Sequence, residues 1–314
     1  MQKIFMTAAL ICAVIFLSSA KTLAAEFELV SYSAQVKLQW LATTGMPEAK
    51  KILAEFGTAN IYGKKNLKDY DRLEKLNGIY QELCYASTAQ YVASKNYKSI
   101  IDIGGGYTPR AVVMVNDGRK YLGAELNAVA ISAMQIMPKF IKPEFQQNLF
   151  YDEVLVEDRF AMNEAVGKVG RPVCIIEDGL MIYLTKERAD KMFTIIHDVL
   201  KQNGGCYITS DFVTEKMFKD LAVAIYGENS AQKLFDETAK MYENLFGEPL
   251  HLNTFKSEIE VINFLKAKGL NVRQVPLIED PSQLYSLKKL NTYQASQLKK
   301  ICAKNYLWVI TAES

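Results

Sequence analysis

Histidine is scarce in this chain, and several signals of common protein classes are missing from it. The 314 residues include only two histidines, so few side chains can act as a neutral base near pH 7. The five cysteines have no zinc-ligand spacing. No basic block and no interleaving of aromatic with basic residues is present, which argues against nucleic acid as a partner. Repeats and low-complexity linkers are absent too.

A hydrophobic run of membrane-spanning length is also lacking. The apolar stretch at 4–17 is shorter than the roughly 20 residues that a spanning helix needs. It follows the basic start Met-Gln-Lys and precedes small polar residues, a pattern that predicts a secretory signal peptide over residues 1–25. We therefore expect export to a periplasmic or secreted location. An uncleaved leader that anchors the protein in a membrane is the alternative.

Net charge of one sign is absent once this leader is removed. Its loss takes Lys3 and Lys21 from the 37 basic residues, which leaves 35 basic against 35 acidic residues. Hydrophobic residues make up 49% and charged residues 23% of the chain, the profile of a soluble globular protein. Four cysteines remain, which are Cys84, Cys174, Cys206 and Cys302. The sequence is compatible with disulfides between them and with buried free thiols.

Two kinds of pattern divide the rest of the chain. Residues 26–98 have helical periodicity, with a stop at Gly45 and a break expected at Gly78. Residues 99–314 alternate short β-branched runs with helical stretches, which predicts a parallel sheet covered by helices on both faces. A helical insertion at about 214–255, rich in Phe, Tyr and Met, is expected to form a lid. The expected strands are 99–104, 120–126, 153–157, 172–178, 205–212, 270–277 and 305–313.

Three consecutive glycines follow the first expected strand, in the stretch "SIIDIGGGYTPR". Thr108 and Pro109 predict that a helix begins directly after the loop, with Thr108 as its N-cap. The free amides of such a helix start favour an anion, and glycines let a ligand approach the backbone closely. A dinucleotide loop needs a third glycine where Pro109 stands. S-adenosylmethionine fits better, because Glu125 follows Gly104 by 21 residues, the spacing of a ribose-binding acid.

Further acids are expected at the same edge of the sheet, because parallel strands end on one side. Asp158, Asp178 and Asp211 each lie at the end of an expected strand. Taken singly, each could be a helix cap. Together with Glu125 they indicate a ligand-binding edge. A metal-assisted variant, with Mg²⁺ between Asp178 and Asp211, is a minor alternative, and no metal site is predicted.

The stretches "IDIGGGYTPRA" and "IIEDGLMIYLT" resemble the leucine carboxyl methyltransferase family, which includes polyketide O-methyltransferases. The family's first motif reads roughly L-G-A-G-x-D-T-R, and Thr108 and Pro109 depart from it. Its later motif reads roughly E-G-x-L-x-Y-L, with Asp178 in place of its glutamate here. The resemblance runs from about residue 98 to the end. It implies a seven-stranded Rossmann-like methyltransferase sheet, with an N-terminal helical segment before it, that uses S-adenosyl-L-methionine.

Carried over position by position, the resemblance implies a set of cofactor-binding residues. These are Asp102, Gly104, Gly106, Arg110, Glu125, Asp158, Arg159 and Asp178. The family also has an arginine on the helix before the first strand, and this chain has no base at 79–94. Arg110 is the candidate to replace it.

The expected reaction is methyl transfer to a carboxylate of a small molecule or peptide, which needs no general base. Tyr183 and His251 are weak candidates for a catalytic role. An exported, degenerate methyltransferase scaffold that acts as a binding protein is the rival hypothesis.

Overall fold

The computed structural model describes residues 33–57, 70–246 and 255–313. The expected leader at 1–25 and His251 lie outside these residues. Within them, no helix is both long and apolar enough to cross a bilayer.

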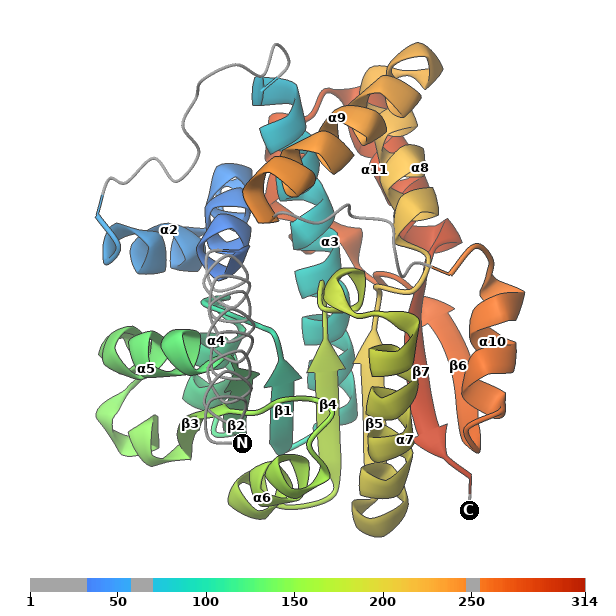
Figure 1. The fold of residues 1–314 in the computed structure, drawn as a ribbon. Helices are drawn as coiled ribbons and strands as arrows, with labels where there is room; N and C mark the ends of the chain where they lie inside the picture. The colour runs from blue at the N-terminus through green and yellow to red at the C-terminus, as the bar shows by residue number, and fades with distance from the viewer. Residues whose placement is uncertain (1–32, 58–69, 247–254, 314) are drawn as a thin grey trace, which may run out of the picture.

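A seven-stranded sheet forms the centre of the molecule, in the order β3-β2-β1-β4-β5-β7-β6 (Figure 1). β7 is antiparallel to both of its neighbours, and the pairs from β3 to β5 are parallel. The chain order reverses between β1 and β4, where open α/β sheets have their ligand crevice. The strands are β1 Ser99–Ile103, β2 Lys120–Glu125, β3 Leu149–Glu153, β4 Val173–Glu177, β5 Gly205–Thr209, β6 Leu270–Pro276 and β7 Tyr306–Ala312.

Helices cover both faces of the sheet. Three of the helices in the described residues come before β1 in the chain. The helical segment before β1, the mixed sheet and the helical insertion after β5 confirm the expected fold class. The helices are residues 33–44, α2 Pro47–Ala54, α3 Tyr70–Lys95, α4 Arg110–Asn116, α5 Asn127–Ile136, α6 Arg159–Val169, α7 Lys186–Asn203, α8 Thr214–Tyr226, α9 Glu228–Phe246, α10 Glu258–Lys266 and α11 Thr292–Lys304, with short 3₁₀ turns η1 Met137–Phe140, η2 Pro143–Asn148, η3 Met181–Tyr183, η4 Pro281–Gln283 and η5 Tyr285–Lys289.

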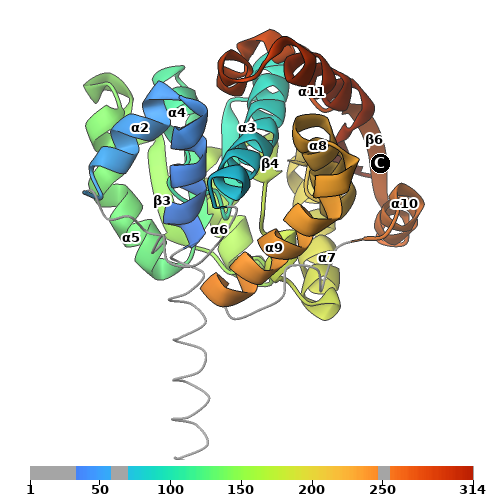
Figure 2. The same cartoon turned by 90° about the horizontal axis from the view of Figure 1, so that it is seen from above.

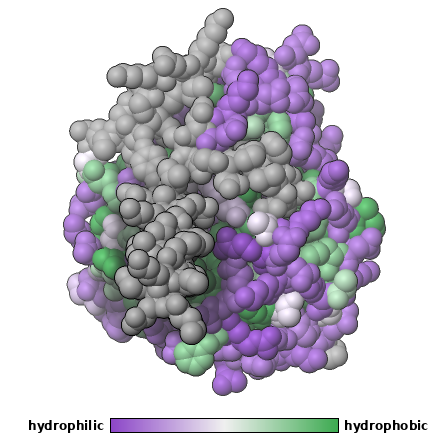
Figure 3. Space-filling model, viewed as in Figure 1, coloured by the Kyte–Doolittle hydropathy of each residue, from purple (hydrophilic) through white to green (hydrophobic). Residues whose placement is uncertain are grey.

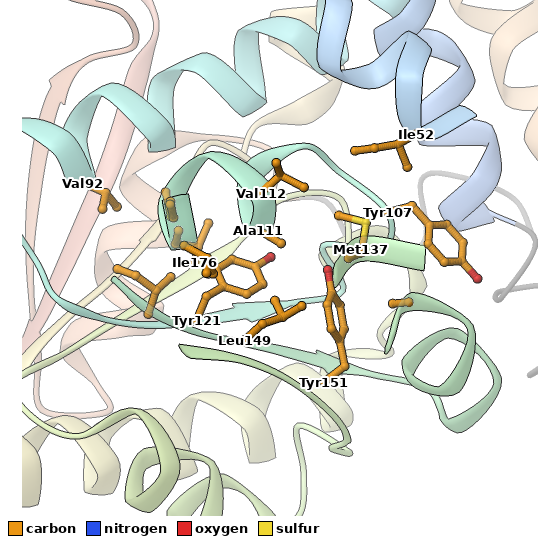
Figure 4. Close-up of a cluster of buried hydrophobic side chains, with 14 of the residues drawn as sticks. Ile52, Val92, Tyr107, Ala111, Val112, Tyr121, Met137, Leu149, Tyr151 and Ile176 are labelled. Atoms are coloured by element: carbon orange, nitrogen blue, oxygen red, sulfur yellow. The ribbon is translucent and has the colours of Figure 1, made fainter. Parts of the chain in front are cut away.

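Two hydrophobic clusters lie on opposite faces of the sheet, because successive strand side chains point to opposite sides. Ile100 belongs to the cluster under α2, α3, α4 and α5, whereas Ile101 belongs to the cluster under α6, α7 and α10. Figure 4 shows part of the first cluster, in which Tyr121 and Tyr151 lie near Ala111 of α4. Both faces of the central strands β1, β4 and β5 are therefore buried, which explains their mostly apolar sequences.

A third hydrophobic cluster joins α3, α8, α9 and α11. Helices α8 and α9 and the first half of α3 lie beyond the arrowheads of β1, β4 and β5, at the end of the sheet where the ligand edge is expected, and α3 then continues along one face of the sheet (Figures 1 and 2). Glu82 of α3 accepts hydrogen bonds from the backbone amides of Tyr285 and Ser286, at 2.6 and 3.0 Å. The coloured surface in Figure 3 is mostly hydrophilic, with hydrophobic residues scattered over it.

One expected strand is wrong. β3 occupies Leu149–Glu153, not 153–157. Val154 and Val156 are buried in the core cluster under α6, so they keep a strand-like apolar pattern although they follow the strand. Asp158 consequently lies five residues beyond β3, at the start of α6.

Two expectations about helix boundaries are also wrong. α3 runs through Gly78 without a break. A Cβ at Gly78 would come within 2.5 Å of the Thr43 Oγ1 atom, so the glycine permits two helices to cross closely. Thr108 does not cap α4, since its buried hydroxyl has no hydrogen-bond partner and Pro109 occupies the N-cap position.

Candidate functional site

The glycine loop and Glu125 lie side by side at the carboxyl edge of the sheet. The Gly106 amide donates a hydrogen bond to Glu125 Oε1 at 2.5 Å, and the Gly104 amide bonds the Ala124 carbonyl at 3.0 Å. Both Gly104 and Gly106 have positive φ, at 65° and 62°, a conformation that residues with a Cβ rarely adopt. The bend therefore needs its glycines, and the hydrogen bond from Gly106 holds it against Glu125.

The loop after β4 faces the glycine loop across the point where strand order reverses. A Cβ on Gly104 would lie 3.6 Å from the Leu180 Cβ atom. Gly104, Gly179 and Leu180 are half-buried, whereas Gly105 and Gly106 are buried. The accessible rim of the site is therefore the Gly104 side of the loop.

The helix at 33–44 covers the other side of the glycine loop. A Cβ at Gly106 would come within 2.8 Å of the Ala34 Cβ atom. The same helix carries Lys37, whose ammonium donates to the main-chain oxygen of Asp178 at 2.5 Å. Lys37 is 9% exposed, and sequence analysis missed it because it lies 141 residues from its partner.

Arg110 forms a buried ion-pair network below this loop. Its guanidinium contacts Asp102 at 2.7 Å and Asp178 at 2.5 Å, and it donates to Thr88 Oγ1 at 2.8 Å. The Asp102 carboxylate also accepts from the Tyr121 hydroxyl at 2.5 Å. Arg110 and Asp102 are both 0% exposed. The two side chains join β1 to the loop after β4 inside the protein, and neither is accessible to solvent.

Two more carboxylates fix the turn after β4. Glu177 accepts from the amides of Leu180 and Met181 at 2.6 and 3.3 Å. Asp211, after β5, accepts from the Gly179 amide at 3.0 Å. Three successive amides of the turn are thus held by two acids from neighbouring strands. The signal for this role was present in the sequence, since Glu177 and Asp211 stand at expected strand ends.

Burial perturbs the acids of this edge strongly. It raises the pKa of Glu125 to about 8, with the hydrogen bond from Gly106 acting in the opposite direction. Burial and the nearby Asp211 raise the pKa of Glu177 to about 8. Burial also raises the pKa of Asp178 to about 6, although Arg110 and Lys37 lower it. For Asp211, burial and the charge of Asp178 raise the pKa to about 6. Perturbed acids in a crevice are a frequent mark of a functional site.

The remaining predicted site residues are placed as follows. Asp158 is exposed and caps α6, accepting from the amides of Phe160 and Ala161 at 2.9 and 3.2 Å. Arg159 is exposed and pairs with Asp198 at 2.6 Å. Tyr183 lies in η3 after β4, and burial raises the pKa of its phenol. In the described part of the chain, no group of three or more His, Cys, Asp or Glu side chains is arranged to hold a metal ion.

No protein-family model matches this chain, and no curated protein matches it. Similar solved structures include magnesium protoporphyrin IX methyltransferase from Synechocystis PCC 6803, with 12% identity, coverage of 86% of this chain and 95% of that one, and a TM-score of 0.44. An O-methyltransferase family protein from Burkholderia thailandensis has 11% identity, coverage of 90% and 72%, and a TM-score of 0.43. Geranyl diphosphate C-methyltransferase from Streptomyces coelicolor A3(2) has 10% identity, coverage of 80% and 85%, and a TM-score of 0.39.

Scores at this level establish neither family nor activity. The class of protein is defined by this chain's own topology and site. It is an open α/β protein in which a glycine loop and a strand-end acid lie beside the point where the strand order reverses.

Proposed function

We propose that this protein is an S-adenosylmethionine-dependent methyltransferase. The observation that carries the proposal is the 2.5 Å hydrogen bond between the Gly106 amide and Glu125. It brings together the side-chain-free loop and the acid that a ribose diol needs, near the point where the strand order reverses between β1 and β4. Methyl transfer from a sulfonium is an in-line displacement, to which a protein contributes mainly placement and exclusion of water.

Each end of the cofactor has candidate partners. Glu125 would accept from the ribose hydroxyls, and Asp158 would lie near the adenine. Lys37 is the base suited to the cofactor carboxylate, because the hydrogen bond of its ammonium to the described residues goes to the carbonyl oxygen of Asp178. It would supply the positive charge that the sequence hypothesis assigned to Arg110.

The acceptor that we propose first is a carboxylate, because it needs no general base. His197, the histidine within the described residues, contacts Asp198 on α7 and lies beside Gly269, the residue before β6. A hydroxyl acceptor is the second candidate, because Asp211 has a pKa of about 6 and could act as its base near neutral pH.

Binding of S-adenosylmethionine tests the proposal directly. We expect a concentration-dependent rise in melting temperature, since a ligand that binds only the folded state stabilises it. The rise should be lost in Glu125→Ala and kept in Glu164→Ala, an exposed site on α6. The absence of any shift with the unaltered protein would refute the proposal.

The methylated product then identifies the acceptor. Radiolabelled methyl groups on a carboxylate are released as methanol by mild alkali, whereas those on a hydroxyl are retained. The export expected from residues 1–25 is a separate proposal, and the N-terminal residue of the mature protein tests it.

A further inference from the structure

Cys174 and Cys206 lie side by side on neighbouring strands. They are directly opposite each other in the parallel pairing of β4 with β5. Their Sγ atoms are 3.8 Å apart, although the residues are separated by 32 positions in the chain. Each is the second residue of its strand, so the pair lies at the opposite end of β4 and β5 from Asp178 and Asp211.

The geometry of this thiol pair suits a disulfide. Both cysteines are free thiols in the structure. Disulfides join residues whose Cα atoms are about 4.4–6.8 Å apart, and neighbouring strands of a sheet are about 4.8 Å apart. Side chains that are directly opposite on parallel strands also point to the same face of the sheet. The bond can therefore form by rotation of the side chains, without a change in strand register.

The surroundings of Cys206 favour its thiolate. Its pKa lies below the ordinary value for a thiol, because Cys174 and Tyr97 hydrogen-bond its sulfur and Arg273 adds positive charge, although burial acts in the opposite direction. Burial raises the pKa of Tyr97, so its hydroxyl keeps its proton and can donate it to the hydrogen bond. The guanidinium of Arg273 is held by the Tyr91 hydroxyl, to which it donates at 2.9 Å. A thiolate is the nucleophile in thiol–disulfide exchange.

The other cysteines of the described chain do not have these properties. Burial raises the pKa of Cys84, and it raises the pKa of Cys302 to about 12. Burial also raises the pKa of Cys174 well above its ordinary value. Cys206 is therefore the cysteine of this set that is suited to react first.

Tyr97 lies between Cys206 and the surface. Its side chain is half-buried, its neighbours Asn96 and Lys98 are exposed, and its hydroxyl hydrogen-bonds the Cys206 sulfur. These three residues form the short connection between α3 and β1. Cys206 itself is 1% exposed. Rotation of one half-buried ring would therefore give a small reagent a route to its sulfur.

We infer that Cys174 and Cys206 form a reversible thiol–disulfide site, in which Cys206 is the attacking thiol and a small disulfide is the co-reactant. The inference does not depend on the proposed function. The export expected from residues 1–25 would place the protein in an oxidising compartment, where disulfides form and persist.

The exchange has two steps. The Cys206 thiolate attacks one sulfur of the small disulfide, whose S–S bond breaks and releases one thiolate. The Cys174 thiol then loses its proton and attacks the Cys206 sulfur in the mixed disulfide, which releases the second thiolate. The cysteine pair has then lost two electrons and two protons, and the small disulfide has been reduced to two thiols.

Peptide analysis after oxidation tests the inference. The reduced full-length protein is treated with bis(2-hydroxyethyl) disulfide at pH 8, denatured, alkylated and digested for mass spectrometry. We expect the peptides of Cys174 and Cys206 to be joined with the loss of two hydrogen atoms. Dithiothreitol should separate them again, and Cys84 and Cys302 should be recovered in the alkylated form.

Two single variants separate the roles of the cysteines. Cys174→Ala should stop at the mixed disulfide and carry the reagent on Cys206. Cys206→Ala should leave Cys174 unmodified, with a reaction at least about tenfold slower, because a buried thiol with a raised pKa is a poor nucleophile. Cys302→Ala, at another buried cysteine, is the control and should form the disulfide normally.

Oxidation should also change the stability of the protein. A cross-link across 32 residues restricts the unfolded chain, so we expect a rise in melting temperature of roughly 5 °C. Cys174→Ala, treated in the same way, should show no rise. A bond that forms but lowers the melting temperature would contradict the claim that it fits the sheet.

Two outcomes overturn the inference outright. One is recovery of both Cys174 and Cys206 as free thiols after the treatment. The other is modification of Cys84 or Cys302 at the same rate as Cys206, since this would indicate reaction of an unfolded chain. If a variant does not fold, the peptide analysis of the unaltered protein still decides.

Discussion

Arg110 connects three elements through one side chain. It bonds Thr88 on α3, Asp102 on β1 and Asp178 after β4, and it is completely buried. Removal of one member of a buried ionic network leaves the others uncompensated, which costs roughly 3–5 kcal/mol. We therefore expect Arg110→Met to lower the free energy of unfolding by that amount, as measured by urea denaturation.

Arg188→Met is the matched control for this change. Arg188 is half-exposed and pairs with Glu157, and an exposed pair contributes less than about 1 kcal/mol. Equal losses in the two variants would contradict the role assigned to Arg110.

The sequence predicted the residues of this site better than it predicted their contacts. Gly104, Gly106 and Glu125 were identified from local motifs, since each lies within a few residues of a strand end. Lys37 was missed because its contact with Asp178 depends on how two distant segments pack. Arg110 was expected to face a ligand, and its burial could not be read from the motif that contains it.

At the scale of elements, the helix at 33–44 depends on a glycine beneath it. Gly106→Ala would place a Cβ within 2.8 Å of the Ala34 Cβ atom. It would also force alanine into a left-handed conformation, at a cost of roughly 1–2 kcal/mol. We expect Gly106→Ala to have a lower melting temperature than the control variant Gly118→Ala and to bind S-adenosylmethionine more weakly, both measured by thermal shift.

Gly118→Ala is the control, because Gly118 also has a positive φ but has more room for a side chain. Gly118 has a φ of +78°, and its nearest contact for an added Cβ is a Phe145 ring atom at 3.9 Å. It should show the conformational cost alone. If both variants lose the same stability, the packing of the 33–44 helix on the loop does not matter energetically.

Most elements could be predicted because their patterns have local causes. Buried parallel strands read as apolar runs, and glycine or proline marked several helix ends. Gly78 and residues 153–157 misled the prediction for tertiary reasons. Gly78 makes room for a crossing helix, and Val154 and Val156 are buried by packing after the strand has ended. Periodicity alone cannot distinguish these cases.

At the scale of the whole molecule, the buried acids determine how stability changes with pH. Burial raises the pKa of Glu125 and Glu177 from 4.5 to about 8, and that of Asp178 and Asp211 from 3.8 to about 6. The folded state therefore binds protons that the unfolded chain releases. Stability conferred by these protons is complete below pH 4 and is lost as the pH rises through 6 and then 8.

We expect the melting temperature of the ligand-free protein to fall between pH 5.5 and 8.5. Glu125→Gln should flatten the upper part of this curve, because it removes one group that titrates near pH 8. Glu164→Gln, at an exposed position on α6, should leave the slope unchanged. A melting temperature that rises steadily over this range would contradict the assignment.

The hydrogen bonds from Tyr285 and Ser286 to Glu82 span 203 and 204 residues of sequence. They tie the helices before β1 to the last part of the chain, as the contacts of Thr88 and Lys37 tie them to β4. A truncation that begins at Ser99 would strip partners from these buried groups and expose the cluster shared by α3 and α11. Expression of residues 99–313 alone should consequently give aggregated material.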